Sequence, residues 1–327
     1  MRRLANCAGC VATRPRIALI AAMAAFVASG APDPAPAATS FELTEVAPGV
    51  AVHRGAIAVP DGGNAGDVAN LGVVIGSRCV AVIDSGGSTA VGSALRKAIG
   101  ARTATPVCYV INTHGHPDHI LGNRAFHAAD GPQFVGHARL APAMAARGAH
   151  YLNAARRDIG AAGGEFELVV PTIAVGDRLE LDLGDRRIEL QAWPTSHTDQ
   201  DLTVFDPVTG TIFLGDLVFD EHLPVLDGNL EGWLAAHDRL ATLPVRLAVP
   251  GHGQPGDLKP LLERQRRYLV DLRDQVRAAI RRREPLAATV ESLGTSPGPS
   301  GGGKWALVDE FQRRNVTAAY AELEWDD

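Results

Sequence analysis

The segment NTHGHPDHILGN, residues 112–123, places four potential metal ligands within six residues: His114, His116, Asp118 and His119. His114 and His116 are two residues apart just after a predicted strand, and in extended backbone that spacing points both side chains to one side. Asp118 and His119 follow Pro117, where we predict that a helix begins, so they project in another direction. Two groups of ligands at a small offset would suit two adjacent metal ions.

Three further candidate ligands each follow an apolar stretch that we predict to be a strand: His197 in PTSHT, Asp216 in FLGD and His252 in VPGHG. Functional groups commonly lie on loops that a rigid scaffold holds in place. The seven side chains together are enough for a site with two metals. Imidazole and carboxylate without thiolate favour two zinc ions, with iron or manganese as alternatives. Two such ions can share and ionise a water near neutral pH and polarise the bond under attack.

The elements that would position these residues alternate between strands and helices. Strands are predicted at LGVVIG, CVAVID and PVCYVIN, the last of which leads directly into the histidine segment. Helices are predicted at TAVGSALRKAIG, at GWLAAHDRLATL, over residues 260–283 and over Val308–Leu323. This alternation indicates an α/β layered domain. A helical insert from Ala138 to Ile159, which contains Tyr151, would either roof the site or form a solvated helix pair.

The overall composition narrows the function classes. The 327 residues are 46% hydrophobic and 21% charged, with a formal net charge of -6, which is an ordinary globular profile. Without a basic surplus the chain does not resemble a nucleic-acid binder, and we expect a small-molecule substrate.

The first 38 residues differ from the rest of the chain. Arginines without any acidic residue precede the apolar run IALIAAMAAFVAS and the proline-rich GAPDPAPAA, the pattern of a secretory signal peptide with a linker. We therefore expect a periplasmic or secreted protein with no transmembrane span after cleavage; an uncleaved membrane anchor is the alternative. The predicted domains are this signal and linker at 1–38, the main domain at 39–256, and a C-terminal helical extension at 257–327 packed on the same domain.

Export also changes how the cysteines are interpreted. Cys7 and Cys10 precede the apolar run and would leave with the signal peptide. Cys79 and Cys108 each lie in a strand-like stretch, and we expect them to be buried thiols. A disulfide between neighbouring strands is the alternative that an oxidising compartment permits.

The order H-x-H-x-D-H, then His, Asp and His, resembles the metallo-β-lactamase superfamily over Phe41 to Gln254. The resemblance implies a four-layer αββα sandwich with metals at the edge between its two sheets. It implies that the first metal is held by His114, His116 and His197. It implies that the second is held by Asp118, His119 and His252, with Asp216 bridging. Asp84 in DSGGS resembles the family's first motif, in which the aspartate supports the metal loop.

Two details narrow the branch of that family. Aspartate at position 216 resembles hydroxyacylglutathione hydrolases and lactonases, whereas the best-known zinc β-lactamases carry cysteine there. Longer phrases, among them CYVINTHGHPDHILGN and GDLVFDEHLPVLDGNLEGWL, resemble the quinoprotein relay system zinc metallohydrolases, exported proteins associated with PQQ-dependent dehydrogenases. We therefore expect an exported dinuclear zinc hydrolase that cleaves an ester, lactone, thioester or amide by metal-bound hydroxide, with Asp118 orienting the hydroxide.

Three alternatives remain open at this stage. The first is β-lactamase activity, and the second is a persulfide dioxygenase with one iron held by His114, His197 and Asp216. The third is a metal-binding accessory protein without catalytic activity.

Further residues have predicted roles around the ligands. His222 and Asp227 follow Asp216 closely enough to contact substrate, with a capping or turn role as the alternative. Asp201, four residues after His197, is expected to bond the second nitrogen of a ligand histidine, with an ordinary strand-start role as the alternative.

Overall fold

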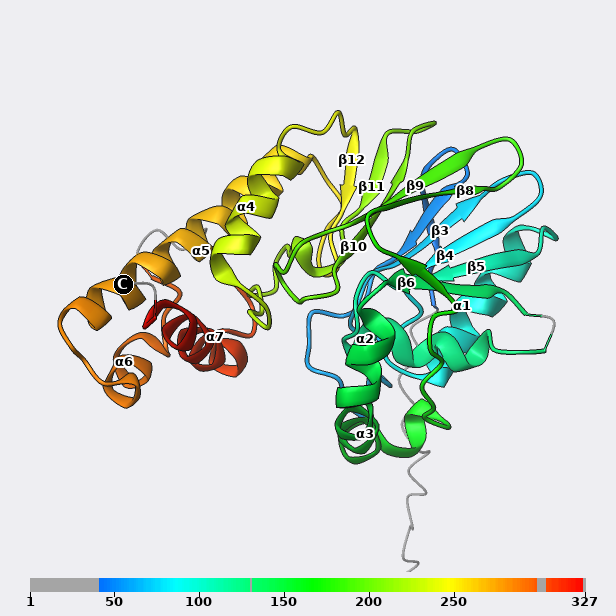
Figure 1. Cartoon of the computed structure of the whole chain (residues 1–327). Helices are drawn as coiled ribbons and strands as arrows, with labels where there is room; N and C mark the ends of the chain where they lie inside the picture. The colour runs from blue at the N-terminus through cyan, green and yellow to red at the C-terminus, as the bar shows by residue number, and fades with distance from the viewer. Residues whose placement is uncertain (1–40, 130, 299–303, 326–327) are drawn as a thin grey trace, which may run out of the picture. The chain divides into compact units, whose positions relative to one another are not determined.

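Two β-sheets lie face to face at the centre of the protein (Figure 1). The computed structural model describes residues 41–129, 131–298 and 304–325. The predicted signal peptide and linker, residues 1–38, lie outside the described residues. Among the helices of the described ranges, none is long and apolar enough to cross a membrane.

The first sheet has seven strands in the order of the chain. They are β1 (Thr44–Ala47), β2 (Val50–His53), β3 (Leu71–Ile75), β4 (Val80–Ile83), β5 (Val107–Ile111), β6 (Gln133–His137) and β7 (Ile173–Val175). Neighbours are antiparallel from β1 to β4 and parallel from β4 to β7. β4 is buried along its whole length, which explains its uninterrupted apolar sequence VAVI.

The second sheet has five strands in the order β12-β11-β10-β9-β8. They are β8 (Arg178–Asp182), β9 (Arg187–Ala192), β10 (Leu202–Asp206), β11 (Thr211–Phe213) and β12 (Leu247–Val249). β9 alternates between buried Ile188 and Leu190 and exposed Arg187 and Glu189, the pattern of a strand with one face toward the core. Only β11 and β12 pair in parallel, so both lead toward the same edge.

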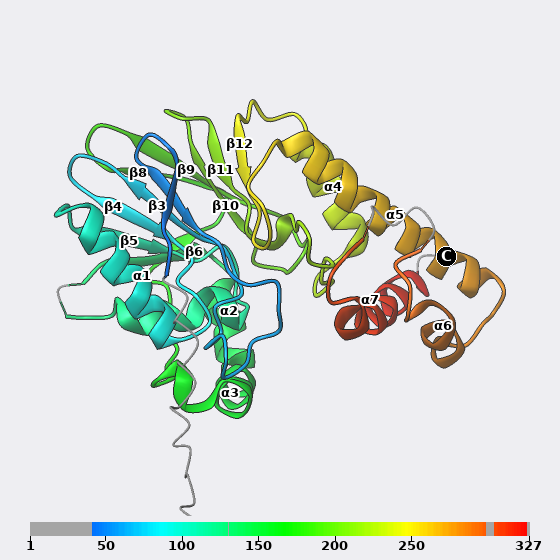
Figure 2. The ribbon, with the colours of Figure 1, turned by 180° about the vertical axis from the view of Figure 1, so that it is seen from behind.

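Helices cover the outer face of each sheet. The helices of the described residues are α1 (Thr89–Arg102), α2 (Pro117–Ile120), α3 (Leu140–Asp158), α4 (Leu230–Leu240), α5 (Leu258–Arg281), α6 (Leu286–Leu293) and α7 (Val308–Leu323), with short 3-10 turns η1 (Leu121–Ala125), η2 (Gly160–Gly163) and η3 (Gly215–Leu217). Leu95 and Ile99 of α1 pack on Val73 and Val82 of the first sheet. α4 and α5 pack on Ile212 of β11. Figures 1 and 2 show α4 and α5 beside β12 from both sides.

Helix, sheet, sheet and helix therefore follow one another, with a core between the two sheets. The predicted αββα sandwich is confirmed.

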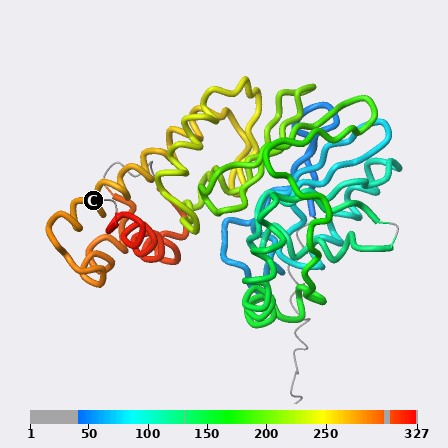
Figure 3. The backbone as a smooth tube through the Cα atoms, viewed as in Figure 1, coloured from blue at the N-terminus to red at the C-terminus, as the bar shows by residue number. Residues whose placement is uncertain are grey.

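The C-terminal helices belong to the same hydrophobic core as the second sheet. Buried Tyr268 and Leu272 of α5 and Val316 of α7 share a core cluster with Ala248 of β12. In Figure 3 these helices, orange to red, run beside the yellow segment that contains α4. The sequence predicts a helix over Val308–Leu323, and α7 has these bounds.

The expectation that Cys79 and Cys108 are buried thiols is wrong, because the two form a disulfide. β4 and β5 are parallel neighbours in which Val80 pairs with Val107. That register brings the two cysteine Cα atoms to 5.4 Å, within the usual range for a disulfide.

Candidate metal centre

All seven predicted ligands lie at one edge of the two sheets, where strands end. His114 and His116 follow β5, Asp118 and His119 open α2, His197 lies between β9 and β10, Asp216 lies in η3 after β11, and His252 follows β12. Backbone hydrogen bonds join the two sheets at this edge. Leu202 N donates to Thr113 O at 2.7 Å, and Asn70 N donates to Gly251 O at 2.7 Å. The edge is therefore a rigid junction rather than a set of independent loops.

The ligands form two groups in which the ligating atoms lie within 4.8 Å of one another. We call His114, His116, His197 and Asp216 the first group, and Asp118, His119 and His252 the second group.

Asp216 faces both groups with one carboxylate oxygen each. Oδ2 lies 3.7 Å from His114 Nε2 and 3.5 Å from His197 Nε2. Oδ1 lies 3.2 Å from His119 Nε2 and 3.5 Å from His252 Nε2. This arrangement agrees with the bridging role that the family resemblance implies.

The donor set fits metal ions. Three buried atoms that point into the two groups lack a hydrogen-bond partner in the described part of the chain: His114 Nε2, His119 Nε2 and Asp216 Oδ1. Leaving buried polar atoms unsatisfied costs about 1–3 kcal/mol each, so they need a partner of another kind. Imidazole nitrogens and carboxylate oxygens are ligands that zinc accepts, although iron and manganese accept them too.

Backbone and carboxylate oxygens fix the orientation of the ligand histidines. In the second group, His119 Nδ1 lies 2.8 Å from Asp84 Oδ2, and His252 Nδ1 lies 2.8 Å from Val68 O. Asp84 also accepts hydrogen bonds from the backbone and the hydroxyl of Thr113. The structure thus places Asp84 behind the histidine loop, as expected from DSGGS.

In the first group, His197 Nδ1 lies 2.7 Å from Val225 O. His116 is turned the other way, with Nε2 3.1 Å from Asp227 Oδ2 and Nδ1 3.1 Å from His197 Nε2. His116 therefore offers Nδ1 to the first group, while His114 and His197 offer Nε2.

The two groups differ in electrostatics. Burial holds the pKa of His114 well below its usual range and lowers that of His197 to about 3. Burial also acts to lower the pKa of His119 and His252, but nearby carboxylates, led by Asp216, outweigh it. The pKa of His119 is raised well above its usual value, and that of His252 is raised to about 9. Carboxylates therefore act more strongly on the histidines of the second group than on those of the first.

Two glycines that sequence reasoning missed allow Asp216 to reach both groups. A Cβ on Gly251 would lie 1.9 Å from Asp216 Oδ1, so any side chain there would displace the carboxylate. Gly215 has a φ of +50°, and a Cβ on it would meet Thr113. In the sequence, each of these glycines directly precedes a ligand, Asp216 in LGD and His252 in PGH, and this position could have identified them.

The predicted contact between Asp201 and a ligand histidine is wrong. Asp201 accepts hydrogen bonds from Thr198 N at 2.9 Å and Thr198 Oγ1 at 2.6 Å, and the Nδ1 of His197 is already bonded to Val225 O. The turn after His197 brings Asp201 back onto its own loop. Burial raises the pKa of Asp201 to about 8.

A cavity of about 640 Å³ opens over the two groups. His116, Asp118, Asp216 and His252 reach it from the ligand side, and residues of α3 and α7 line its other walls. His222 and Asp227, which were expected to contact substrate, also line it. The helical insert therefore does contribute to the walls of the pocket, through Arg147 and Tyr151 among others.

His222 and Asp227 are, however, already engaged by protein atoms. His222 Nδ1 lies 2.6 Å from Leu223 O, its ring stacks on Phe311, and burial lowers its pKa to about 4. Asp227 contacts His116, Arg147 and Arg314. Sequence reasoning missed both arginines, because isolated charged residues on predicted helices carry no distinctive signal.

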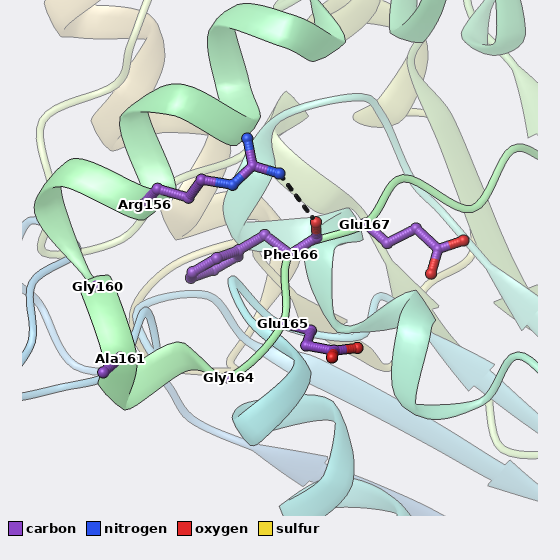
Figure 4. A pocket seen from close by; sticks show the side chains of 7 residues that line it. All are labelled: Arg156, Gly160, Ala161, Gly164, Glu165, Phe166 and Glu167. Carbon is purple, nitrogen blue, oxygen red and sulfur yellow. Dashed lines mark hydrogen bonds between the residues drawn. The ribbon is translucent and has the colours of Figure 1, made fainter.

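A separate pocket of about 600 Å³ lies beside the end of α3 (Figure 4). Arg156 donates a hydrogen bond to Phe166 O there, and Glu165 and Glu167 point away from that contact. None of the seven ligands lines this pocket, so it is not part of the metal centre.

Comparisons with known proteins bear on this fold. The sequence profile of the metallo-beta-lactamase superfamily matches residues 65–252, more than half of the chain. The search of curated proteins found no match.

Solved structures that are similar to this chain include a sulfatase and a β-lactamase. The stereoselective inverting sec-alkylsulfatase Pisa1 from Pseudomonas sp. superposes with a TM-score of 0.65 and 17% identity, over 86% of this chain and 50% of that protein. A metallo-beta-lactamase from Pontibacter korlensis superposes with a TM-score of 0.57 and 22% identity, over 70% of this chain and 99% of that protein. This chain spans about half the length of the sulfatase. By the profile match, it belongs to the metallo-β-lactamase superfamily.

Proposed function

We propose that this protein is a dinuclear zinc hydrolase that cleaves an ester, lactone, thioester or amide. The observation that carries the proposal is the single carboxylate of Asp216, which faces two groups of buried histidines with one oxygen each. A site with one metal would not require the second oxygen to face a second set of ligands. When bound, the two ions would supply an ionised water as nucleophile and would polarise the bond that it attacks.

Asp118 is the residue of this chain that we assign to the reaction. Its side chain is 18% exposed and lines the cavity, and its Oδ2 lies 3.3 Å from His252 Nε2. Burial acts to raise the pKa of Asp118, but His119 and His252 outweigh it and hold the pKa below its usual range. An ionised Asp118 accepts hydrogen bonds, so it is suited to orient the attacking water.

We further propose that the protein is exported and works with a periplasmic quinoprotein dehydrogenase system. The signal-like residues 1–38 and the phrase-level similarity described above support this setting. The disulfide between Cys79 and Cys108 agrees with an oxidising compartment.

Metal content of the purified mature protein, followed by turnover of a substrate panel, tests the proposal. We expect two zinc ions per chain and hydrolysis of at least one ester, lactone, thioester or amide. One iron with oxygen uptake on a persulfide would instead establish the dioxygenase, and turnover confined to β-lactams would establish a β-lactamase. An intact two-metal site without turnover of any compound would favour the non-enzymatic accessory protein.

The panel should include secondary alkyl sulfates. The match to the sulfatase covers 86% of this chain, against 70% for the β-lactamase, and so extends well beyond the segment that the superfamily profile covers. Turnover confined to sulfate esters would replace the acyl substrates in our proposal.

Asp118→Ala tests the assigned residue. We expect turnover to fall by about 100-fold or more, the usual contribution of a positioned acid–base group. The metal content has to be measured on the same sample, since Asp118 is also a ligand candidate. Full turnover with both metals bound would contradict the role.

A further inference from the structure

Two arginines from distant helices meet at the mouth of the cavity. Arg147 of α3 binds Asp227 Oδ2, and Arg314 Nη2 of α7 lies 3.1 Å from Asp227 Oδ1. The same carboxylate contacts His116 Nε2. Asp227 therefore holds both guanidinium groups beside His116, on the side of the ring opposite the Nδ1 that faces His197.

These contacts leave one positive charge in excess. Two guanidinium groups face one carboxylate, and among the described residues no other acidic side chain forms an ion pair with Arg147 or Arg314. Each guanidinium has five N–H donors and uses only part of them on Asp227. The side chains are 48% and 50% exposed, so the remaining donors are within reach of a ligand in the cavity.

Neighbouring residues add a hydroxyl and an apolar surface. Tyr151 lines the cavity beside Arg147, and burial raises the pKa of Tyr151, so its hydroxyl stays neutral. Phe219, Phe311 and Val225 line the same cavity and offer apolar surface to a bound molecule. The cavity thus offers a bound molecule cationic groups, apolar surface and the metal groups.

We propose that Arg147 and Arg314 form a subsite for a carboxylate on the substrate. The preferred substrate would then be an acyl compound that carries a free carboxylate some distance from the bond to be cleaved. Guanidinium forks suit this ligand because they match the geometry of a carboxylate, and Asp227 fixes them in place beforehand. This inference deepens the proposed hydrolase function and rests on it.

Matched ester pairs test the subsite in the metal-loaded protein. The mono-4-nitrophenyl esters of succinate, glutarate and adipate are compared with the same esters whose free carboxylate is a primary amide. For at least one chain length we expect kcat/KM to be about tenfold higher for the carboxylate, and the ratio to shrink in 0.5 M NaCl, where charges about 3–5 Å apart begin to be screened. In the double variant Arg147→Gln/Arg314→Gln the ratio should fall to near one.

Arg156→Gln/Arg313→Gln is the matched control, with the same change on exposed arginines of the same two helices that do not line the cavity. It should keep the ratio of the unmodified protein. A ratio near one in the unmodified protein, or a ratio that survives in the Arg147/Arg314 variant, would overturn the subsite.

Binding separates failure of the subsite from failure of the hydrolase proposal. Calorimetry of the metal-loaded protein compares glutarate with glutaramate, which both keep one carboxylate for the metals. Glutarate should bind about tenfold more tightly, and Arg147→Gln/Arg314→Gln should remove that difference. Tighter glutarate binding without turnover of any ester, lactone, thioester or amide would keep the subsite and end the hydrolase proposal. Ester turnover with equal binding of glutarate and glutaramate would keep the hydrolase proposal and overturn the subsite.

Discussion

The two groups of ligands are supported by different parts of the chain. The second group depends on the first half, through Asp84 on His119 and Val68 O on His252. The first group depends on the segment from His222 to Asn229, through Val225 O on His197 and Asp227 on His116. The two groups therefore have largely different supports and share Asp216, and Asp84 also reaches His114 of the first group through the Thr113 hydroxyl.

The C-terminal helices contact the loops that support the first group. Asn315 of α7 donates to Pro224 O at 2.6 Å and accepts from Leu226 N at 2.9 Å. Gln265 of α5 accepts from Phe219 N and donates to Leu217 O beside Asp216. α5 and α7, which follow the segment matched by the superfamily profile, thus hold the loops that support the first group and Asp216. The second group has fewer contacts with these two helices.

Asp84→Asn should give the largest difference between the groups. Asparagine tolerates the φ of +57° at this position, so the turn should survive. His119 Nδ1 and the Thr113 hydroxyl now both contact Oδ2 of Asp84. In asparagine an NH2 group, which donates hydrogen bonds, would take the place of one carboxylate oxygen. We expect one of two metals to bind about 100-fold more weakly, at the upper end for lost supporting contacts. Stepwise zinc titration against a chelator measures both affinities, and equal weakening of both metals would refute separate support.

Asn315→Ala should weaken the other half. It leaves the buried Leu226 N–H and Pro224 C=O without partners, so we expect a loss of about 2 kcal/mol in the free energy of unfolding. The metal that Asp84→Asn leaves intact should be the one that weakens here. Thr317→Ala, an exposed change on the same helix, should stay within about 0.5 kcal/mol of the unmodified protein. Denaturant unfolding and the same zinc titration measure both effects.

Asp227→Asn should lower the metal affinity of the first group alone, and by less than Asp84→Asn lowers the affinity of the second. His116 would keep an oxygen partner but lose a charged one, so we expect one metal to bind about tenfold more weakly. Arg147→Gln is the control, because it removes an arginine and leaves the Asp227 carboxylate on His116. If both variants lower metal affinity equally, the arginine and not the contact to His116 is responsible.

Asp201→Asn should have the smallest effect on the metal affinities and should instead change the pH dependence of the free energy of unfolding. The pKa of Asp201 in the folded protein is about 8, above its ordinary 3.8, so folding takes up a proton between these values. Stability linked to Asp201 is therefore fully present below about pH 4 and is lost as pH rises through about 8. Asparagine can keep both bonds to Thr198 and does not titrate. The difference in unfolding midpoint between variant and unmodified protein should grow from pH 5 to pH 8.5; a constant difference would contradict the raised pKa.

The two aspartates that were predicted to support ligands show what sequence reasoning can reach. Asp84 follows β4 and His119 lies beyond β5, and because these strands are parallel neighbours their ends lie together. Asp201 is only four residues from His197, but a turn directs it to Thr198 instead. Position at the end of a strand correctly predicted which aspartate contacts a ligand histidine. Closeness in sequence did not, because the path of the loop decides where a side chain points.

Contacts between distant segments could not be predicted from the sequence, because they too depend on where the folded chain places each side chain. Asp227 and His116 are 111 residues apart, and Arg314 is 87 residues from Asp227. An arginine on a helix surface has the same local pattern whether it faces solvent or a cavity. The disulfide was also undecided, because its formation depends on the register between β4 and β5.

The sequence by itself determined the kinds of ligand, their order and the layered fold, because ligand chemistry and hydrophobic periodicity are local properties of the chain. Only the tertiary structure decided which oxygen of Asp216 faces which group, which nitrogen His116 offers, and which segments support each group. Those features depend on distances between segments that the packing of two sheets and the C-terminal helices brings together.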